Sequence, residues 1–132
     1  MSRFSSGPRS RADLVASGEL IEAPASLVAE AGIRYPVALT RAAWEDAVAW
    51  TDADNDRKGT IQDETGRLWD VLWMSRIPLT WTNPYDRDGV TVALYRTPRP
   101  GRARKPRRVS LHAVIGWDYG RPVVTVGLPG EL

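Results

Sequence analysis

The sequence predicts a single α+β domain, with short N-terminal helices packed on an antiparallel sheet of four to five strands. Two observations predict this class. In the first half of the chain, apolar residues recur at helical spacing behind residues that start helices, whereas in the second half they alternate with a period of two. Helices followed by strands are typical of α+β proteins. The 132 residues, 42% hydrophobic and 26% charged, have the composition of one folded domain.

The composition also excludes several kinds of site. The chain has no cysteine and one histidine, His112, which excludes disulfides, thiolate metal sites, cysteine nucleophiles and a two-histidine metal site within one chain. No run of 18 apolar residues is present, and no apolar stretch follows the N-terminal arginines as it would in a secretory signal. We therefore expect a cytoplasmic protein that uses no cofactor and does not contact a membrane.

The first elements are defined by their caps. Residues 1–9 lack apolar periodicity and are expected to form a flexible tail, so that the folded domain spans 10–132. Ser10 is a favourable N-cap, and Asp13 three residues later completes a weak capping box. Gly18 then provides a C-terminal cap, which predicts a short first helix.

Two further helices are expected before the middle of the chain. A short extended piece at 19–22 is followed by Pro24, which suits the first helical position, and by Gly32, which ends the second helix. Thr40 is the best N-cap in the sequence and predicts a third helix over about 41–51. An apolar stripe at helical spacing supports this helix, and it consists of Ala43, Trp44, Ala47, Val48 and Trp50.

The segment 68–76 is ambiguous between strand and helix. From Leu68 to Met74 apolar residues fall on both faces, and the flanking Gly66 and Pro78 favour a buried central strand. A helix remains open, because Leu68 lies four residues before the next leucine and the two tryptophans here have the same spacing.

Three later segments are clearer strands. Apolar residues alternate with other residues over 90–95, 109–115 and 123–128. Asp118 and Gly120 supply turn residues between the last two of these segments.

Four stretches of the chain resemble a known family. They are RYPVALTRAAWED at 34–46, QD at 62–63 with GRLWDVLWM at 66–74, LYRTPR at 94–99 and LPGE at 128–131. Together they resemble an uncharacterised family of small bacterial proteins encoded on plasmids, integrative elements and phages. The resemblance implies an accessory gene of a mobile genetic element, with a role in maintenance, transfer or anti-defence. Residues 77–89 depart from the family pattern, so the resemblance implies nothing about them.

Positive charge is concentrated in one segment. Residues 1–95 contain ten basic and fourteen acidic residues, whereas residues 96–108 contain seven basic and no acidic residues. Prolines and a glycine in this segment prevent a helix, so we expect an extended or mobile arm between two strands. Three interpretations remain open: a contact with nucleic acid, an anchor for an acidic protein, and a solvated hairpin loop whose arginines pair with the acidic half of the chain.

The aromatic residues fall into two groups. Those in predicted helices and strands are expected in the core, namely Trp44, Trp50, Trp69 and Trp73. Those in polar loops lack an obvious core partner and are candidate stacking or interface anchors, namely Trp81, Tyr85, Trp117 and Tyr119.

An acidic run follows the third helix. Asp52, Asp54, Asp56 and Asp63 match positions 1, 3, 5 and 12 of a calcium loop. The rest of the loop pattern fails, because Arg57 stands where a glycine is needed and a lysine follows it. We therefore interpret the run as an exposed loop and expect no metal.

The sequence thus predicts a non-enzymatic accessory binding protein without catalytic residues. Its partner would be nucleic acid or a host protein that handles nucleic acid. The first alternative is direct DNA or RNA binding without a protein target, and the second is a metal- or carboxylate-dependent enzyme around Asp52 to Asp63. The oligomeric state is left open. The candidate contact residues are Arg99, Arg102, Arg104, Lys105, Arg107 and Arg108 from the basic segment, with Trp81, Tyr85, Trp117 and Tyr119 as aromatic anchors.

Overall fold

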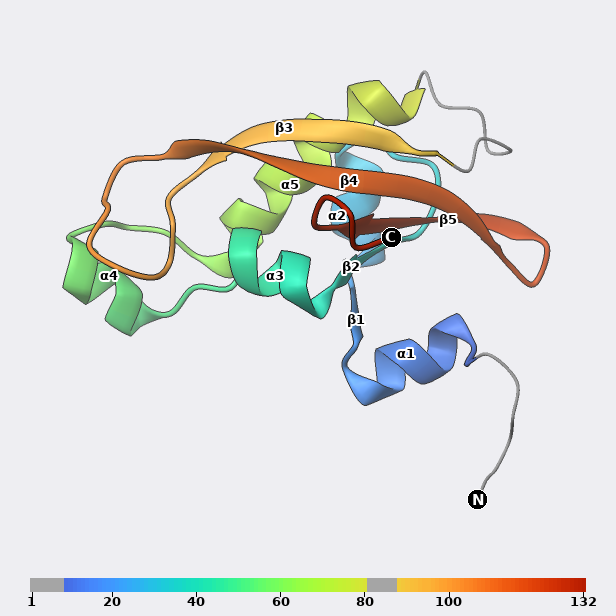
Figure 1. Ribbon diagram of the computed structural model, residues 1–132, viewed down its shortest axis with the longest axis horizontal. Helices are drawn as coiled ribbons and strands as arrows, with labels where there is room; N and C mark the ends of the chain where they lie inside the picture. Colours follow the sequence, from blue (N-terminus) through green and yellow to red (C-terminus); the bar gives the residue numbers. More distant parts are fainter. Residues whose placement is uncertain (1–8, 81–87) are drawn as a thin grey trace.

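The computed structural model describes residues 9–80 and 88–132 (Figure 1). Two predicted anchors, Trp81 and Tyr85, lie outside the described residues, as does most of the predicted N-terminal tail. The described elements, in chain order, are α1 (Arg11–Ser17), β1 (Leu20–Glu22), α2 (Ala25–Glu30), β2 (Val37–Thr40), α3 (Arg41–Ala47), α4 (Asp52–Lys58), α5 (Glu64–Thr80), β3 (Val90–Arg96), β4 (Arg107–Asp118) and β5 (Arg121–Gly127).

The α+β prediction is confirmed, and the sheet is mostly antiparallel. Its five strands lie in the order β1-β2-β5-β4-β3. The pairs β1–β2, β3–β4 and β4–β5 are antiparallel, as expected. The pair β2–β5 is parallel, with Val37 opposite Val124 and Leu39 opposite Val126. A parallel pair needs a long connection, and here that connection includes three helices and two strands.

The capping signals in the first half are confirmed. Ser10 and Asp13 form the capping box of α1, and Gly18 ends the helix with a φ of 83°. Pro24 precedes α2 as its N-cap rather than as its first residue. The Thr40 hydroxyl accepts a hydrogen bond of 3.1 Å from the Ala43 amide at the start of α3.

The third helix ends earlier than predicted. α3 stops at Ala47, four residues before the expected end, although Val48, Ala49 and Trp50 remain buried. Their apolar side chains made them look like a continuation of the helix, because burial and helical periodicity give similar patterns over so few residues.

The strand expected over 68–76 is wrong, because this segment belongs to the 17-residue helix α5. One face of the helix is buried, through Leu68, Val71, Leu72, Ser75 and Leu79. Trp73, Met74 and Ile77 are exposed, so the apolar residues that suggested two faces of a strand extend around a helix. Pro78 lies in the last turn of α5 and does not end it.

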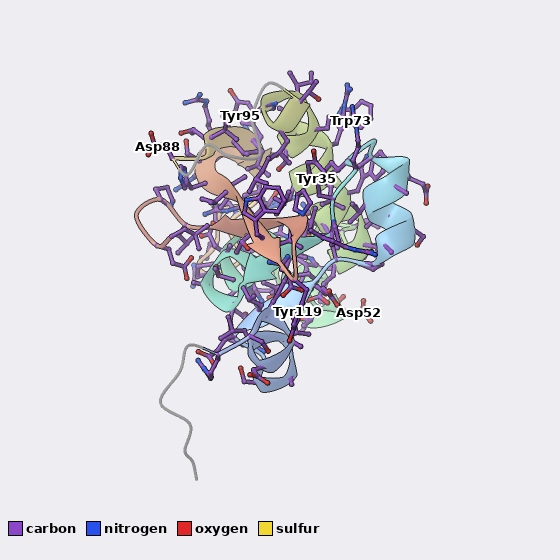
Figure 2. The ribbon with its side chains drawn as sticks, turned by 90° about the vertical axis from the view of Figure 1, so that its right-hand side faces the viewer. Tyr35, Asp52, Trp73, Asp88, Tyr95 and Tyr119 are labelled. Carbon is purple, nitrogen blue, oxygen red and sulfur yellow. The ribbon has the colours of Figure 1, made fainter. Side chains whose placement is uncertain are left out.

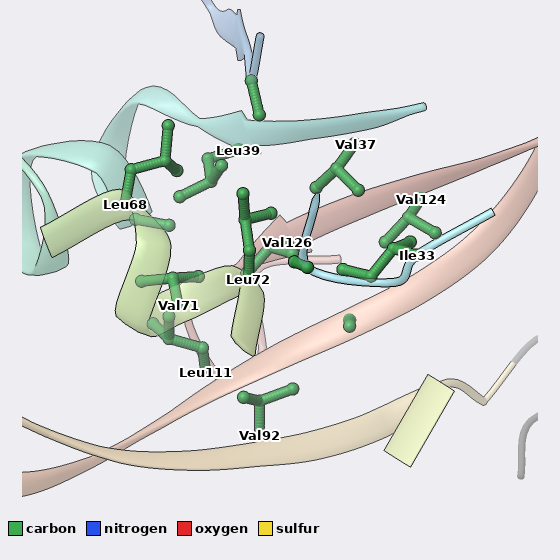
Figure 3. Close-up of a cluster of buried hydrophobic side chains, with 14 of the residues drawn as sticks. Ile33, Val37, Leu39, Leu68, Val71, Leu72, Val92, Leu111, Val124 and Val126 are labelled. Atoms are coloured by element: carbon green, nitrogen blue, oxygen red, sulfur yellow. The ribbon is translucent and has the colours of Figure 1, made fainter. Parts of the chain in front are cut away.

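The core lies between the helices and one face of the sheet (Figure 3). Leu72 of α5 belongs to the same buried cluster as Leu39 of β2, Leu111 of β4 and Val126 of β5. The last strand therefore joins side chains from both halves of the chain. No helix in the described ranges is long and apolar enough to cross a membrane.

The four tryptophans expected in the core behave differently. Trp50 is buried, whereas Trp44 and Trp69 are partly buried against the core. Trp73 is exposed and stacks on Trp69, with ring centroids 5.6 Å apart, and the Arg76 guanidinium lies 3.7 Å from the Trp73 ring centroid on the same helix.

Candidate functional site

The basic segment 96–108 forms one end of the β3–β4 hairpin. It includes the end of β3, the connecting loop 97–106 and the start of β4. Figure 1 shows this loop beside α4, at the opposite end of the hairpin from the β4–β5 turn. The segment is therefore a hairpin loop docked on a helix rather than the free arm expected from its composition.

The acidic run that was expected as an exposed loop forms α4. Thr51 and Asp54 make a complete capping box at its start, and Gly59 ends it with a φ of 64°. The sequence signal for this helix was present, because Thr51-x-x-Asp54 has the spacing of a capping box.

Asp54 links α4 to the basic segment. The carboxylate is 3% exposed and accepts hydrogen bonds from the Thr51 amide and hydroxyl at 2.9 and 3.0 Å. It also pairs with Arg57 and with Nε of Arg99, each at 2.9 Å. Burial by itself raises the pKa of Asp54, but the hydrogen bonds from Thr51, Arg57 and Arg99 outweigh burial and lower the pKa to about 2.

Lys58 of α4 binds the backbone of the loop 97–106. Its side chain is 2% exposed, and Nζ donates to the carbonyl oxygens of Pro98 at 2.6 Å and Ala103 at 2.7 Å, with the Pro100 carbonyl at 3.4 Å. Burial lowers the pKa of Lys58, and the neighbouring Arg57 acts in the same direction. The prolines of the loop have no N–H group, so the loop can form few backbone hydrogen bonds of its own. The Lys58 ammonium satisfies three of its carbonyls instead and thereby fixes the shape of the loop.

Two arginines of the segment pair with the acidic half of the chain. Arg96 pairs with Asp46 of α3 at 2.9 Å, and Arg99 reaches Glu45 at 3.4 Å besides its bond to Asp54. The interpretation of a loop that pairs with the acidic half therefore holds for this part of the segment. Arg99, predicted as a partner contact, is occupied by these carboxylates.

A buried polar cluster supports the base of the loop. The Thr97 carbonyl accepts from Nη1 of Arg67 at 3.0 Å, and its hydroxyl accepts from Gln62 at 3.0 Å. Nε of Arg67 donates to the Val48 carbonyl at 3.0 Å, and the guanidinium lies 4.4 Å from the Trp50 ring centroid. Burial lowers the pKa of Arg67 to about 10, so it stays charged at neutral pH.

The remaining cations of the segment face solvent. None of them forms an ion pair with a carboxylate of the described residues. They are Arg102, Arg104, Lys105, Arg107 and Arg108, all exposed. We call these five residues the cationic tip. It presents five positive charges within seven residues, three in the loop and two, Arg107 and Arg108, at the start of β4.

A cleft of about 470 Å³ opens beside the cationic tip. It lies between the start of α5 and the end of β3, and Pro106 of the loop forms part of its wall. Its other lining residues include Ile61, Gln62, Asp63, Arg67, Trp69, Asp70, Tyr95 and Arg96. No sequence pattern marked this cleft, because its residues come from four separate parts of the chain.

The predicted aromatic anchors do not join the cationic tip. Tyr119 is 91% exposed and lies in the β4–β5 turn, as expected. Trp117 is about half exposed but belongs to β4, where it pairs with Pro122 of β5, and not to the turn. Both lie at the far end of β4, however, and β4 has twelve residues, which separates its ends by about 36 Å. The structure therefore does not bring the two predicted groups into one site (Figures 1 and 2).

The acidic residues that match positions of a calcium loop do not form a metal site among the described residues. Within the described ranges, no group of three or more histidine, cysteine or acidic side chains is placed to hold a metal ion. Asp54 is committed to Thr51, Arg57 and Arg99, and Asp63 accepts from the Gly66 amide at 2.6 Å near the start of α5.

The fold and the site define an α+β protein with a cationic hairpin loop fixed on an acidic helix. No family model, curated protein or solved structure compared with this chain matches it.

The Lys58 contacts predict how the loop responds to a substitution. We expect Lys58→Met to lower the Tm by roughly 5 °C or more, because the carbonyls around Nζ lose their donor. Amide hydrogen exchange over 98–104 would rise at the same time. Lys105→Met is the matched control, since Lys105 is exposed, and it should leave the Tm unchanged. Equal Tm values for the two variants would show that Lys58 does not hold the loop.

Proposed function

We propose that this protein is a non-enzymatic binding protein that contacts the phosphate backbone of nucleic acid through the cationic tip. The single observation that carries the proposal is that five exposed cations, without acidic partners among the described residues, are displayed on a docked loop. Arginine and lysine are the residues that contact phosphates, and four of the five are arginines.

The fixed position of the loop on α4 favours phosphate binding by the cationic tip. Lys58, Asp54 and Thr97 fix the backbone from which the cationic side chains extend. A loop that is ordered before binding loses less conformational entropy when it contacts a partner. Arg96 and Arg99 are paired with carboxylates of the fold, whereas the residues of the cationic tip remain available to contact phosphates.

The biological setting rests on the resemblance to proteins of plasmids, integrative elements and phages. In that setting we propose an accessory, anti-defence or regulatory role, exerted on nucleic acid or on a host protein that handles it. The exposed Tyr119 at the far end of β4 favours a second candidate, in which a protein partner contacts the β4–β5 turn.

Salt dependence of binding tests the proposal. Fluorescence anisotropy with labelled single-stranded and double-stranded DNA and RNA should show binding that weakens steeply with salt. On a duplex, log K falls by about 0.9 per neutralised phosphate for each unit of log salt concentration. Changing all five residues of the cationic tip to serine should abolish binding at low salt.

A pair of double variants controls for net charge. Arg102→Ser with Arg107→Ser should reduce the salt slope by up to about 2. Arg34→Ser with Arg121→Ser removes the same charge from exposed sites elsewhere and should leave the slope unchanged. Equal effects would contradict a specific role for the cationic tip. Binding to polyglutamate but to no nucleic acid would overturn the proposal in favour of an acidic protein partner.

A further inference from the structure

Another, smaller cleft lies between the loop that follows α2 and the last turns of α5. Its volume is about 140 Å³, and it is lined by Arg34 and Tyr35 from the loop and by Arg76 from α5. None of the described residues that line it is acidic; the others are Gly32, Ile33, Leu79 and Thr80. The cleft therefore brings together two arginines from distant parts of the chain without a carboxylate in its wall.

Neither arginine is paired within the described part of the chain. No hydrogen bond or ion pair joins the Arg34 or the Arg76 guanidinium to a described residue, and Nε of Arg76 is buried without an acceptor. Arg34 is exposed. Two like charges that line one cleft repel each other, so an anion between them removes the repulsion and gains charge-assisted hydrogen bonds.

Stacking fixes the position of the Arg76 side chain. Its guanidinium lies 3.7 Å from the ring centroid of Trp73, which in turn stacks on Trp69 with ring centroids 5.6 Å apart. A guanidinium stacked on a ring keeps the N–H groups that lie in its own plane, so these donors remain available to a ligand. The backbone amides of Arg34 and Tyr35 also donate to no described residue. The cleft thus offers hydrogen-bond donors from two separate elements.

From this arrangement we propose that the cleft binds a terminal phosphate group, either free inorganic phosphate or the phosphomonoester of a small molecule. Guanidinium groups pair with phosphate oxygens, and two of them from different elements suit a tetrahedral dianion better than a planar carboxylate. Sites that enclose a whole small molecule have volumes of roughly 300 to 1,000 Å³, so this cleft holds the phosphate and leaves the rest of the ligand outside.

The phosphate site is separate from the cationic tip. Arg76 lies ten residues along α5 from Gly66, which lines the larger cleft together with Pro106 of the loop 97–106, and ten residues of helix span about 15 Å. A phosphate of a nucleic-acid backbone is bridged on two sides and carries one negative charge, whereas a terminal phosphate carries up to two near neutral pH. The phosphate site therefore goes beyond the proposed function and does not rest on it.

Titration of the ¹⁵N-labelled protein with inorganic phosphate, followed by NMR at neutral pH and constant ionic strength, tests the proposal. Saturable shifts are expected at the Arg34 and Tyr35 amides and at the Nε–H group of Arg76. Arg34→Gln should weaken phosphate binding roughly tenfold, because one of two charge-assisted contacts is lost. Since Arg34 is exposed, this variant leaves the Trp73 stack intact. Arg121→Gln removes an exposed arginine elsewhere and is the matched control, with no expected effect.

Three further ligands identify the group that binds. Methyl phosphate, a monoester, should shift the same resonances, and its Kd compared with that of inorganic phosphate tells which of the two sources the cleft prefers. Dimethyl phosphate, a diester like the nucleic-acid backbone, and acetate should each bind roughly tenfold more weakly, because each carries a single charge. A variant with all five residues of the cationic tip changed to serine should bind inorganic phosphate like the wild type.

The outcomes distinguish the phosphate site from the cationic tip. If phosphate shifts no resonance of the cleft, or if Arg34→Gln binds phosphate as tightly as the wild type, the phosphate site is overturned and the proposed function is unaffected. If dimethyl phosphate or acetate binds as tightly as inorganic phosphate, selection for a terminal phosphate is overturned. If the serine variant loses nucleic-acid binding and keeps phosphate binding, both proposals are supported.

Discussion

Asp54→Asn is expected to destabilise the protein by about 3 kcal/mol, because it leaves two arginines without their shared buried carboxylate. The asparagine oxygen can still accept from Thr51, but its NH₂ group would face guanidinium donors. Urea unfolding measures the change in the free energy of unfolding. Asp52→Asn is the matched control on the same helix; Asp52 is exposed, and its loss should change stability by less than about 0.5 kcal/mol.

The stability difference between wild type and Asp54→Asn should also depend on pH. The pKa of Asp54 in the folded protein, about 2, lies below its ordinary value of 3.8. A lowered carboxyl pKa stabilises the fold fully above the ordinary value, and this contribution is lost as the pH falls toward 2. The stability difference between wild type and Asp54→Asn should therefore shrink over that interval. A difference that stays constant down to pH 2 would contradict the role given to this carboxylate.

Gly89→Ala is expected to cost about 3 kcal/mol and to lower the Tm by roughly 10 °C. Gly89 has a φ of 71° where the chain enters β3, and a Cβ there would lie 2.3 Å from the Ala113 carbonyl oxygen of β4. His112 and Val114 side-chain atoms would lie 3.0 Å away. Because the nearest atom is backbone, only separation of the two strands relieves the contact.

Gly101→Ala is the control for backbone conformation alone. Gly101 has a similar φ of 75°, but a Cβ would meet nothing within 4 Å. Its cost should be limited to left-handed strain, about 1 kcal/mol. Thermal unfolding of the two variants distinguishes the contact from the strain. Equal losses would show that the approach to Ala113 is unimportant.

The parts of the fold that could be predicted are those with local signals. Ser10, Gly18 and Thr40 act through hydrogen bonds to near neighbours or through their own φ, so the caps they form are visible in the sequence. Of the three alternating strands, β3 and β4 follow the expected period, whereas β5 buries both Val123 and its neighbour Val124. The parallel pair β2–β5 has no local signal, because it depends on which segments meet across the chain.

The secondary structure of α5 and that of α4 were hard to predict for different reasons. For α5 the sequence favours a strand and leaves a helix open, because the exposed Trp73 and Met74 extend the apolar pattern beyond one helical face. For α4 the many charged side chains predict an exposed loop, whereas in the helix Asp54 and Lys58 are buried. Both residues bond to the loop 97–106, Asp54 through Arg99 and Lys58 through backbone carbonyls, and these contacts are not local.

The candidate site was predictable in charge but not in geometry. The concentration of cations in 96–108 was evident from the sequence, and the five residues of the cationic tip were all among the predicted contacts. Which cations would be occupied by Asp46, Glu45 and Asp54 depends on the packing of the hairpin on α3 and α4. The aromatic turn lies at the other end of β4, a separation that the sequence alone does not reveal.

The position of β5 has a consequence for how the protein is made. β5 follows all the other described elements in the chain, yet it lies between β2 and β4 in the sheet. During synthesis both neighbours of β5 in the sheet, β2 and β4, are translated before the strand that joins them. Until then β2 and β4 each present an open edge that other chains can pair with. We therefore expect the incomplete chain to be prone to aggregation until β5 is inserted between these two edges.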